Sequence, residues 1–355
     1  MPVALIHPGL VCRHKSGGGI PGYNYSVPIT ISNTITSADQ FNVTVYLSGG
    51  QMPGGASGLW SNCQSLGQEI RFTTDAAGSN LIPFENVVAT FSTGGQTCQI
   101  WVNVPHVSSS TPTVIYMWYG NPTAPALSKS DPNGQYAVWN NVTASNSAYS
   151  MVFHFEDLAG YVGGLVADST GVQTSPRQNA VSSTTGEIAA CGSFSAGYID
   201  CAQALSITSP FSMTVWAQTT SAAAQQTIIG NYSGAGGYLL AYYSGYLQYY
   251  NGAAFYSATQ AADTNMDYLG CTYNGSNLAF YINGVQKGTP VAGSTVGSSF
   301  PTRIGSNPNF ASQFTGKIDE VRVGVLTLSS SWIAMEFLNQ SAPGTYITAG
   351  TPVHH

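Results

Sequence analysis

Residues 268–288 read YLGCTYNGSNLAFYINGVQKG and predict a β-hairpin. Two Asn-Gly dipeptides within this stretch mark tight turns, because both residue types tolerate a positive φ angle. After the first turn, Leu278, Phe280 and Ile282 alternate with residues of mixed polarity. Successive side chains of a strand point to opposite faces, so these three side chains share one face. The stretch therefore predicts a strand pair with one face built for a hydrophobic core.

The same short, alternating pattern covers most of the chain. In the first half, residues 25–32 (YSVPITIS) and 40–48 (QFNVTVYLS) are clear examples, with turns rich in Gly, Ser, Asn and Pro around them. The pattern returns at residue 151 and continues to residue 325 with the strand spacing of a sandwich. Only residues 330–340 (SSWIAMEFLNQ) have helical periodicity, and serine caps precede it. A chain of 355 residues is long enough for two such domains.

The second half carries an ordered series of segments in addition to the hairpin. They are MVFHFED (151–157), ADSTG (167–171), PFSMTVWAQT (210–219) and FTGKIDEVRVGVLTLSSSWI (314–333). Taken in this order, they resemble the concanavalin A-like jelly rolls of the laminin-G type over residues 150–342. The resemblance implies a jelly-roll sandwich that ends in a strand and a short helix.

The first half carries a second set of segments: EIRFTTDAAGSNLIPFE (69–85), IWVNVP (100–105) and IYMWYGNPTA (115–124). They resemble an uncharacterised domain family that is often found directly upstream of such jelly rolls. That resemblance implies a β-sandwich and no chemistry. We therefore expect an all-β protein with two β-sandwich domains. Its expected parts are an N-terminal arm (1–20), the uncharacterised β domain (21–148), the concanavalin A-like jelly roll (149–342) and a C-terminal tail (343–355).

Composition restricts the partners that this protein can have. Charged residues make up only 7% of the chain, against roughly 25% in a typical domain. The net charge is -6, and nine Lys and Arg residues form no basic cluster, which argues against nucleic acid as a partner. The sequence contains no run of 18 apolar residues, so it predicts no membrane insertion, and its first residues do not resemble a signal peptide. A surface with so little charge favours a homo-oligomer or a subunit of a larger assembly.

Six cysteines allow two interpretations. No pair has the CxxC spacing of a zinc site. Cys191 and Cys201 flank a short segment and are one candidate disulfide, and Cys63 and Cys98 are a second. Alternatively, all six are free thiols that serve as small buried apolar groups.

Tyrosines gather between residues 238 and 256. Adjacent tyrosines on a strand send one ring to each face, so one of each pair is expected in the core and the other at the surface. Exposed aromatic rings suit contacts with sugars or protein partners, although the β-propensity of Tyr also explains such a stretch. The candidate ligand-binding residues are Tyr243, Tyr246, Tyr249, Tyr250 and Tyr256.

Acidic residues give no catalytic candidate. Glycoside hydrolysis requires two carboxylates that flank one bond, whereas the acids here occur as adjacent residues, 156–157 and 319–320, which a strand directs to opposite faces. Asp168 and Asp319 are candidate calcium ligands, or else structural carboxylates that accept hydrogen bonds from loop amides. No other cofactor is expected. His154 lies between two phenylalanines of a strand and is interpreted as a structural hydrogen-bonding residue.

These observations favour a non-enzymatic virion protein: a phage fibre, a decoration protein or a tail-associated adhesin. Its expected partners are other virion or surface-assembly subunits and a host-surface glycan. One alternative is a purely structural module that docks through its N-terminal arm. The other alternative is a secreted or cell-surface protein, either a carbohydrate-binding module or a polysaccharide-processing enzyme.

Overall fold

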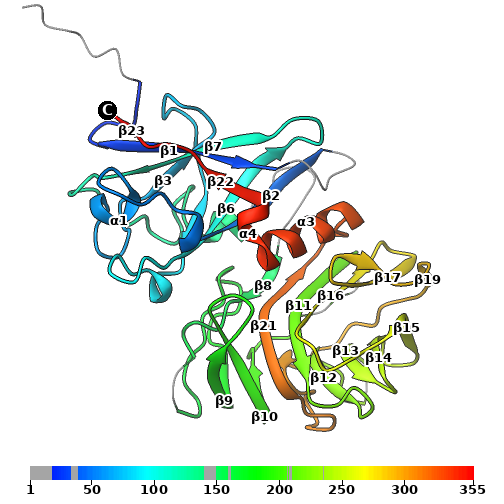
Figure 1. The fold of residues 1–355 in the computed structure, drawn as a ribbon. Helices are drawn as coiled ribbons and strands as arrows, with labels where there is room; N and C mark the ends of the chain where they lie inside the picture. Colours follow the sequence, from blue (N-terminus) through cyan, green and yellow to red (C-terminus); the bar gives the residue numbers. More distant parts are fainter. Residues whose placement is uncertain are drawn as a thin grey trace, which may run out of the picture.

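The computed structural model describes residues 18–32, 39–139, 149–158, 161–205, 207, 210–234 and 236–355. Most of the predicted N-terminal arm, including Cys12, lies outside these residues. The described chain forms two all-β domains, with α3 (Ser330–Ser341) lying between them (Figure 1). No helix in the described ranges is long and apolar enough to cross a bilayer.

The N-terminal domain is a sandwich of two antiparallel sheets. The larger sheet has the order β22-β1-β7-β3-β4, with β23 also pairing with β1, and the smaller has the order β2-β6-β5. Their bounds are β1 (Tyr25–Ile31), β2 (Gln40–Ser48), β3 (Arg71–Thr73), β4 (Leu81–Ile82), β5 (Phe84–Asn86), β6 (Gln99–Val107), β7 (Thr113–Tyr119), β22 (Ile347–Ala349) and β23 (Val353–His354). Short helices join them: η1 (Gly49–Gln51), α1 (Leu59–Asn62), η2 (Val88–Thr90) and α2 (Gln135–Trp139).

Alternation along the strands builds the core of this domain. Val27, Ile29 and Ile31 of β1 are fully buried, and Ile29 lies opposite Ile115 of β7. The other face of β1 is partly exposed. The predicted strand at residues 25–32 is therefore confirmed, with one face in the core.

The C-terminal segment returns to the N-terminal domain. Helix α4 (Pro343–Tyr346) leads into β22, which pairs with β1, and β23 pairs with the start of β1 (Figure 1). The ring of His355 lies 4.8 Å from that of Trp118, and its Nε2 lies 2.8 Å from Ser26 Oγ. The expectation of a separate tail at 343–355 is thus corrected. Without these strands β1 would expose one edge, and unpaired strand edges are commonly covered in native folds.

The C-terminal domain is one strongly curled antiparallel sheet around a second core. Its order is β15-β14-β13-β12-β20-β10-β21-β11-β16-β17-β18, with β8, β9 and β19 pairing at β21, β10 and β17. The bounds are β8 (Tyr149–Phe153), β9 (Arg177–Thr185), β10 (Ala190–Asp200), β11 (Phe211–Thr219), β12 (Gln226–Gly230), β13 (Leu239–Tyr243), β14 (Tyr246–Tyr250), β15 (Phe255–Ala261), β16 (Asp267–Tyr273), β17 (Asn277–Ile282), β18 (Val285–Gln286), β19 (Val291–Ala292), β20 (Arg303–Ile304) and β21 (Thr315–Gly324).

The predicted hairpin is formed by β16 and β17. Leu278, Phe280 and Ile282 are buried in the core of the C-terminal domain, as their alternation predicts. Asn283 and Gly284 then turn the chain into β18 with φ angles of 51° and 76°. A two-residue turn of this kind requires positive φ at both positions, which explains the Asn-Gly pair.

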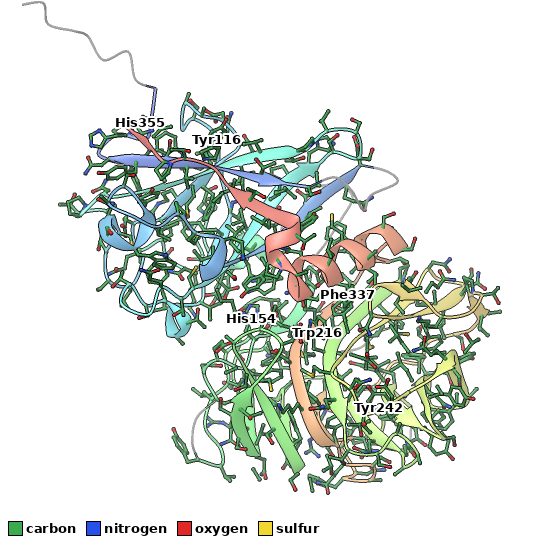
Figure 2. The ribbon with its side chains drawn as sticks, viewed as in Figure 1. Tyr116, His154, Trp216, Tyr242, Phe337 and His355 are labelled. Atoms are coloured by element: carbon green, nitrogen blue, oxygen red, sulfur yellow. The ribbon has the colours of Figure 1, made fainter. Side chains whose placement is uncertain are left out.

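Helix α3 holds the two domains together. Its N-cap, Ser329, accepts a hydrogen bond from the Trp332 amide, so the predicted serine cap is confirmed. From its last turns, Asn339 bonds to the backbone of Tyr46 in β2, and the Gln340 side chain accepts from the Trp216 indole at 2.6 Å. Figure 2 shows Trp216 beside Phe337 of this helix, and their ring centroids lie 5.8 Å apart.

Candidate functional site

Strand register divides the tyrosines of β13 and β14 between the two faces of the sheet. Tyr242 and Tyr249 point into the core of the C-terminal domain and are almost completely buried. Their neighbours Tyr243 and Tyr250 lie on the opposite, outer face of the sheet. The expectation that each adjacent pair is split between core and surface is therefore confirmed. Figure 2 shows Tyr242 within the sandwich.

Four rings on this outer face form a continuous row, here named the aromatic ladder. Tyr232 meets Tyr250 edge to face at 4.9 Å, Tyr250 meets Phe255 at 4.4 Å, and Phe255 stacks on Tyr243 at 4.8 Å. Tyr243 is 36% exposed and Phe255 39% exposed. Tyr246, at the turn between β13 and β14, is 38% exposed on the same side. Within the ladder, Tyr243 and Phe255 are exposed, and Tyr232 and Tyr250 are half-buried.

Two of the predicted ligand-binding tyrosines do not reach this surface. Tyr249 is fully buried, and its hydroxyl has no hydrogen-bond partner. Tyr256 lies opposite Tyr249 in β15 and packs against the same core. Sequence reasoning missed Tyr232 and gave Phe255 no role. The role of Phe255 follows from its cross-strand pairing with Tyr250. No local sequence pattern places Tyr232 beside these two rings.

The ladder offers both apolar faces and polar tips. A hydrogen bond with Tyr232 raises the pKa of the Tyr250 hydroxyl, with a smaller contribution from burial. The Tyr250 hydroxyl therefore stays protonated at neutral pH and can donate or accept hydrogen bonds. Aromatic rings with such tips are suited to stacking against sugar rings or apolar protein groups.

Asp168 does not form a calcium site. Its two carboxylate oxygens accept hydrogen bonds from the amides of Val152, Thr170 and Gln173 and from the Thr170 hydroxyl, at 2.5–3.2 Å. These hydrogen bonds occupy the same Asp168 oxygens that a cation would need as ligands. Asp168 is therefore the structural carboxylate of the alternative interpretation, and it ties its own loop to β8.

Asp319 does not fit calcium either. One of its oxygens accepts hydrogen bonds from the amides of Glu187 and Ile188 at 3.0 Å, a different set of donors from those of Asp168. Burial, followed by the nearby Glu320 carboxylate, raises the pKa of Asp319 well above its usual range. A neutral carboxylic acid is a poor cation ligand. In the described part of the chain, no cluster of three or more His, Cys, Asp or Glu residues could hold a metal ion.

Neither predicted disulfide is present: Cys63, Cys98, Cys191 and Cys201 are all free thiols. Cys191 lies within β10 and Cys201 directly follows the same strand. Ten residues of extended chain separate them by about 30 Å, far beyond a disulfide. Burial raises the pKa of the Cys98 thiol to about 12, so this thiol is unreactive at neutral pH.

Residues 156 and 157 lie in a turn after β8, and the pair Asp319 and Glu320 does not follow strand alternation. A β-bulge interrupts β21 opposite β11, and Glu320 there has a φ of 48°. Asp319 and Glu320 consequently both contact groups outside the core, although Ile318 and Val321 lie in it. The argument from opposite faces is therefore wrong for this pair. Both side chains are nevertheless buried, which keeps any substrate away from them.

Sequence profiles match both halves of the chain. Residues 192–334 match the family described as the concanavalin A-like lectin/glucanases superfamily. The C-terminal half contains a concanavalin A-like jelly-roll domain. Residues 66–162 match a domain of unknown function (DUF2341), as the resemblance implied. No curated protein matches the sequence.

Solved structures resemble parts of this chain at low identity. Domain 4 of AbnA, a GH43 extracellular arabinanase from Geobacillus stearothermophilus in complex with arabinotriose, is 17% identical. The match covers 52% of this chain and 96% of that one, with a TM-score of 0.43. The binding domain of Paraclostridial Mosquitocidal Protein 1 is 13% identical over 53% of this chain and 51% of its own, with a TM-score of 0.42. Trypanosoma rangeli sialidase is 12% identical over 68% and 42%, with a TM-score of 0.38.

A buried charge network joins the concanavalin A-like domain to the N-terminal domain. His154, which lies between the two domains in Figure 2, places Nδ1 2.7 Å from Glu320 and Nε2 3.3 Å from Glu85. Glu85 also accepts from the Trp139 indole at 2.6 Å and the Ser169 hydroxyl at 2.7 Å. The interpretation of His154 as a structural hydrogen-bonding residue is confirmed.

Arg322 extends this network towards α3. Its guanidinium bonds Glu320 at 3.0 Å and also bonds Glu336 of α3. The guanidinium lies 4.3 Å from the ring of Trp101 and 5.1 Å from that of Trp139. All three charged groups are almost inaccessible to solvent. Charged side chains are rarely buried unless they are paired, as they are here.

The network makes the stability of the protein sensitive to high pH. Burial alone would lower the pKa of His154, but the carboxylates of Glu320 and then Glu85 raise it to about 10. A raised pKa gives stabilisation that is complete below the ordinary value of 6.5 and is lost as the pH rises towards 10. We expect the stability difference between the native protein and His154→Gln to fall by about 1.4 kcal/mol per pH unit in that range. Urea unfolding at pH 6, 7, 8 and 9 measures this difference, and a constant difference would contradict the proposed charge on His154.

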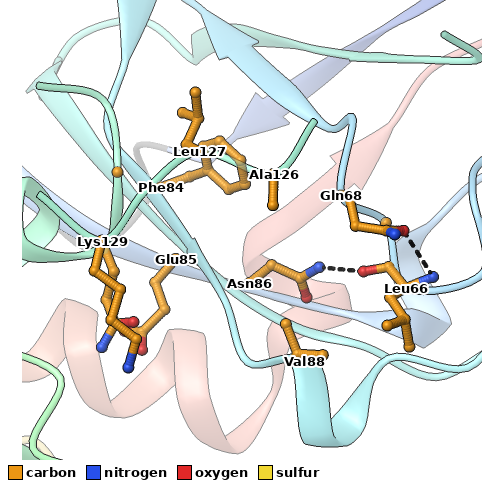
Figure 3. A pocket seen from close by; sticks show the side chains of 12 residues that line it. Leu66, Gln68, Phe84, Glu85, Asn86, Val88, Ala126, Leu127 and Lys129 are labelled. Carbon is orange, nitrogen blue, oxygen red and sulfur yellow. Dashed lines mark hydrogen bonds between the residues drawn. The ribbon is translucent and has the colours of Figure 1, made fainter. Parts of the chain in front are cut away.

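Three cavities adjoin one another, one within the N-terminal domain and two at its boundary with the C-terminal domain. The first, of ≈ 170 Å³, has an apolar lining that includes Phe84 and Leu127, while Glu85 and Lys129 lie at one end (Figure 3). Cavities of ≈ 300 and ≈ 540 Å³ continue along the boundary, and Glu156 lines both. Burial raises the pKa of Glu156, and the hydrogen bond from the Ala190 amide partly offsets this effect. The resulting pKa of Glu156 is about 7. Glu156 can therefore exchange a proton near neutral pH.

Proposed function

We propose that this protein is a non-enzymatic surface protein that binds carbohydrate on its aromatic ladder. The observation that carries the proposal is the row of rings from Tyr232 through Tyr250 and Phe255 to Tyr243 on the open face of the concanavalin A-like domain. The rings hold one another in place, so little side-chain freedom is lost when a ligand stacks on them. The family that this domain matches is named for lectins and glucanases, and this name agrees with a sugar ligand.

A variant pair separates the ladder from the core beneath it. Tyr250→Ala removes the central ring, and we expect its affinity for the bound glycan to fall at least about tenfold. Tyr249→Phe is the matched control, because it removes only a buried hydroxyl without a partner and leaves the ladder intact. Glycan-array screening followed by calorimetry measures both affinities, and circular dichroism checks the fold. Equal losses in the two variants would argue against the ladder as the site, and a blank array would favour the purely structural module.

The non-enzymatic part of the proposal has its own test. The carboxylates at residues 319 and 320 are buried, which leaves Glu156, at the two boundary cavities, as the acid to test. We expect no release of reducing sugar from the bound glycan over prolonged incubation. Release that is abolished by Glu156→Gln would instead identify a polysaccharide-processing enzyme.

We further propose that the protein lies on a phage particle as a fibre, a decoration protein or a tail-associated adhesin. The low charge supports this placement, because a surface of Ser, Thr, Asn and Gln suits close association with other subunits or with further copies of the chain. In this role the ladder would contact host-surface carbohydrate. Mass spectrometry of purified particles is the test, and failure to detect the protein there would favour secretion or a cell-surface location.

A further inference from the structure

The ladder lies in the least charged part of the molecule. No Asp, Glu, Lys, Arg or His occurs between Asp200 and Asp263, a stretch that includes β11 to β15 and every ring of the ladder. The residues beside the rings on the outer face are uncharged as well, including Gln248 and Ser257, which pair across β14 and β15. An acidic sugar placed on this face would therefore meet no cation contributed by these strands.

Arg303 is a charged residue on the same outer face, in β20 beside β12. Its charge is already paired with the carboxylate of Asp200. β20 places Arg303 opposite Gly230 of β12, which in turn lies opposite Leu239. The Arg303 guanidinium bonds Asp200 through Nε at 3.2 Å and Nη2 at 3.1 Å, while Nη1 bonds the carbonyl oxygens of residues 307 and 308 at 3.4 and 3.0 Å. It also lies 4.3 Å from the ring of Phe310. Arg303 is thus held by partners that a ligand carboxylate would have to displace.

The other charges near the ladder's strands are also held or distant. The carboxylate of Asp263 accepts hydrogen bonds from the backbone and side-chain amides of Asn265 at 2.7 and 2.8 Å. Lys287 adjoins Gly288, which lies against Thr259 of β15. Thr259 is four residues along the strand from Phe255, or about 13 Å. Among the residues that the structure describes, the charged groups near the ladder are thus paired or distant from its rings.

We infer that the ligand of the ladder is a neutral polysaccharide, and this inference rests on the proposed function. Recognition of sulfated, uronic or sialic acid sugars uses charge-assisted hydrogen bonds from Arg or Lys, which this face does not offer. Stacking of uncharged sugar rings on aromatic faces needs none. Binding through such contacts does not depend on ionic strength, whereas attraction between exposed charges is screened by salt.

The experiment compares uncharged and acidic polysaccharides with the full-length chain at 0.05 M and 1 M NaCl. Laminarin, xyloglucan and galactomannan serve as neutral probes, and polygalacturonate, hyaluronan and heparin serve as acidic probes. We expect binding to at least one neutral probe, with an affinity that changes less than about twofold between the two salt concentrations. Tyr250→Ala should abolish this binding, and Arg303→Gln should leave it unchanged.

The outcomes separate the inference from the proposed function. Binding to acidic probes alone that weakens in 1 M NaCl and in Arg303→Gln, yet is lost in Tyr250→Ala, would overturn the neutral ligand and leave the ladder as a carbohydrate site. Binding to none of the six probes, together with a blank glycan array, would overturn both.

Discussion

Replacement of Arg322 by methionine is expected to lower the free energy of unfolding by about 3–5 kcal/mol. Arg322 is almost completely buried, and its guanidinium is bonded to both Glu320 and Glu336. Methionine fills much of the same volume between Trp101 and Trp139 but carries no charge. Two buried carboxylates would then lose their shared cation, and an uncompensated buried charge is among the costliest defects in a protein interior.

The measurement for Arg322→Met is urea or guanidinium unfolding at pH 7, with Arg177→Met as the matched control. Arg177 is exposed and bonds one backbone carbonyl, so its replacement should change stability by no more than about 0.5 kcal/mol. Addition of Glu336→Gln to Arg322→Met should recover part of the loss, since it removes one of the orphaned charges. Equal stability of Arg322→Met and the native chain would show that the network contributes nothing to the domain junction.

A chain that ends at Ala342 is expected to lose the cooperative unfolding of its N-terminal domain. The deletion removes α4, β22 and β23 and leaves one edge of β1 unpaired. It also removes Tyr346 and Ile347, each only 1% exposed. Burial of a large apolar side chain contributes about 1.5–3 kcal/mol, and a whole domain is stable by only about 5–15 kcal/mol.

A chain that ends at Gly350 is the control for this truncation. It keeps β22 and both buried side chains and loses only β23 and His355. We expect this control to unfold cooperatively at a slightly lower temperature, whereas the chain ending at Ala342 should be cleaved rapidly by protease within residues 18–139. Protease resistance equal to that of the full chain would show that the N-terminal sandwich is complete without its C-terminal strands.

The ladder illustrates how far a candidate site can be predicted from a local pattern. The tyrosine-rich stretch correctly indicated where exposed rings would gather, and three of the five candidates, Tyr243, Tyr246 and Tyr250, are on the surface. Alternation fixed that Tyr249 and Tyr250 face opposite ways but could not fix which of them is inside. That choice depends on the strands that pack over each face, and these are distant in sequence.

The sequence by itself determined the all-β class, the Asn-Gly hairpin, the helix at residues 330–340 and the low charge of the chain. Each depends on neighbours within a few residues: strand alternation, positive φ in turns, helix capping and composition. Only the tertiary structure decided the burial of Tyr249, the return of the C-terminal strands to β1, and the network of Glu85, His154 and Arg322 between the domains. The contact between Glu85 and His154 spans about 70 positions and the pairing of β22 with β1 over 300, because a buried charge or an open strand edge is stabilised by whichever distant segment the fold brings against it.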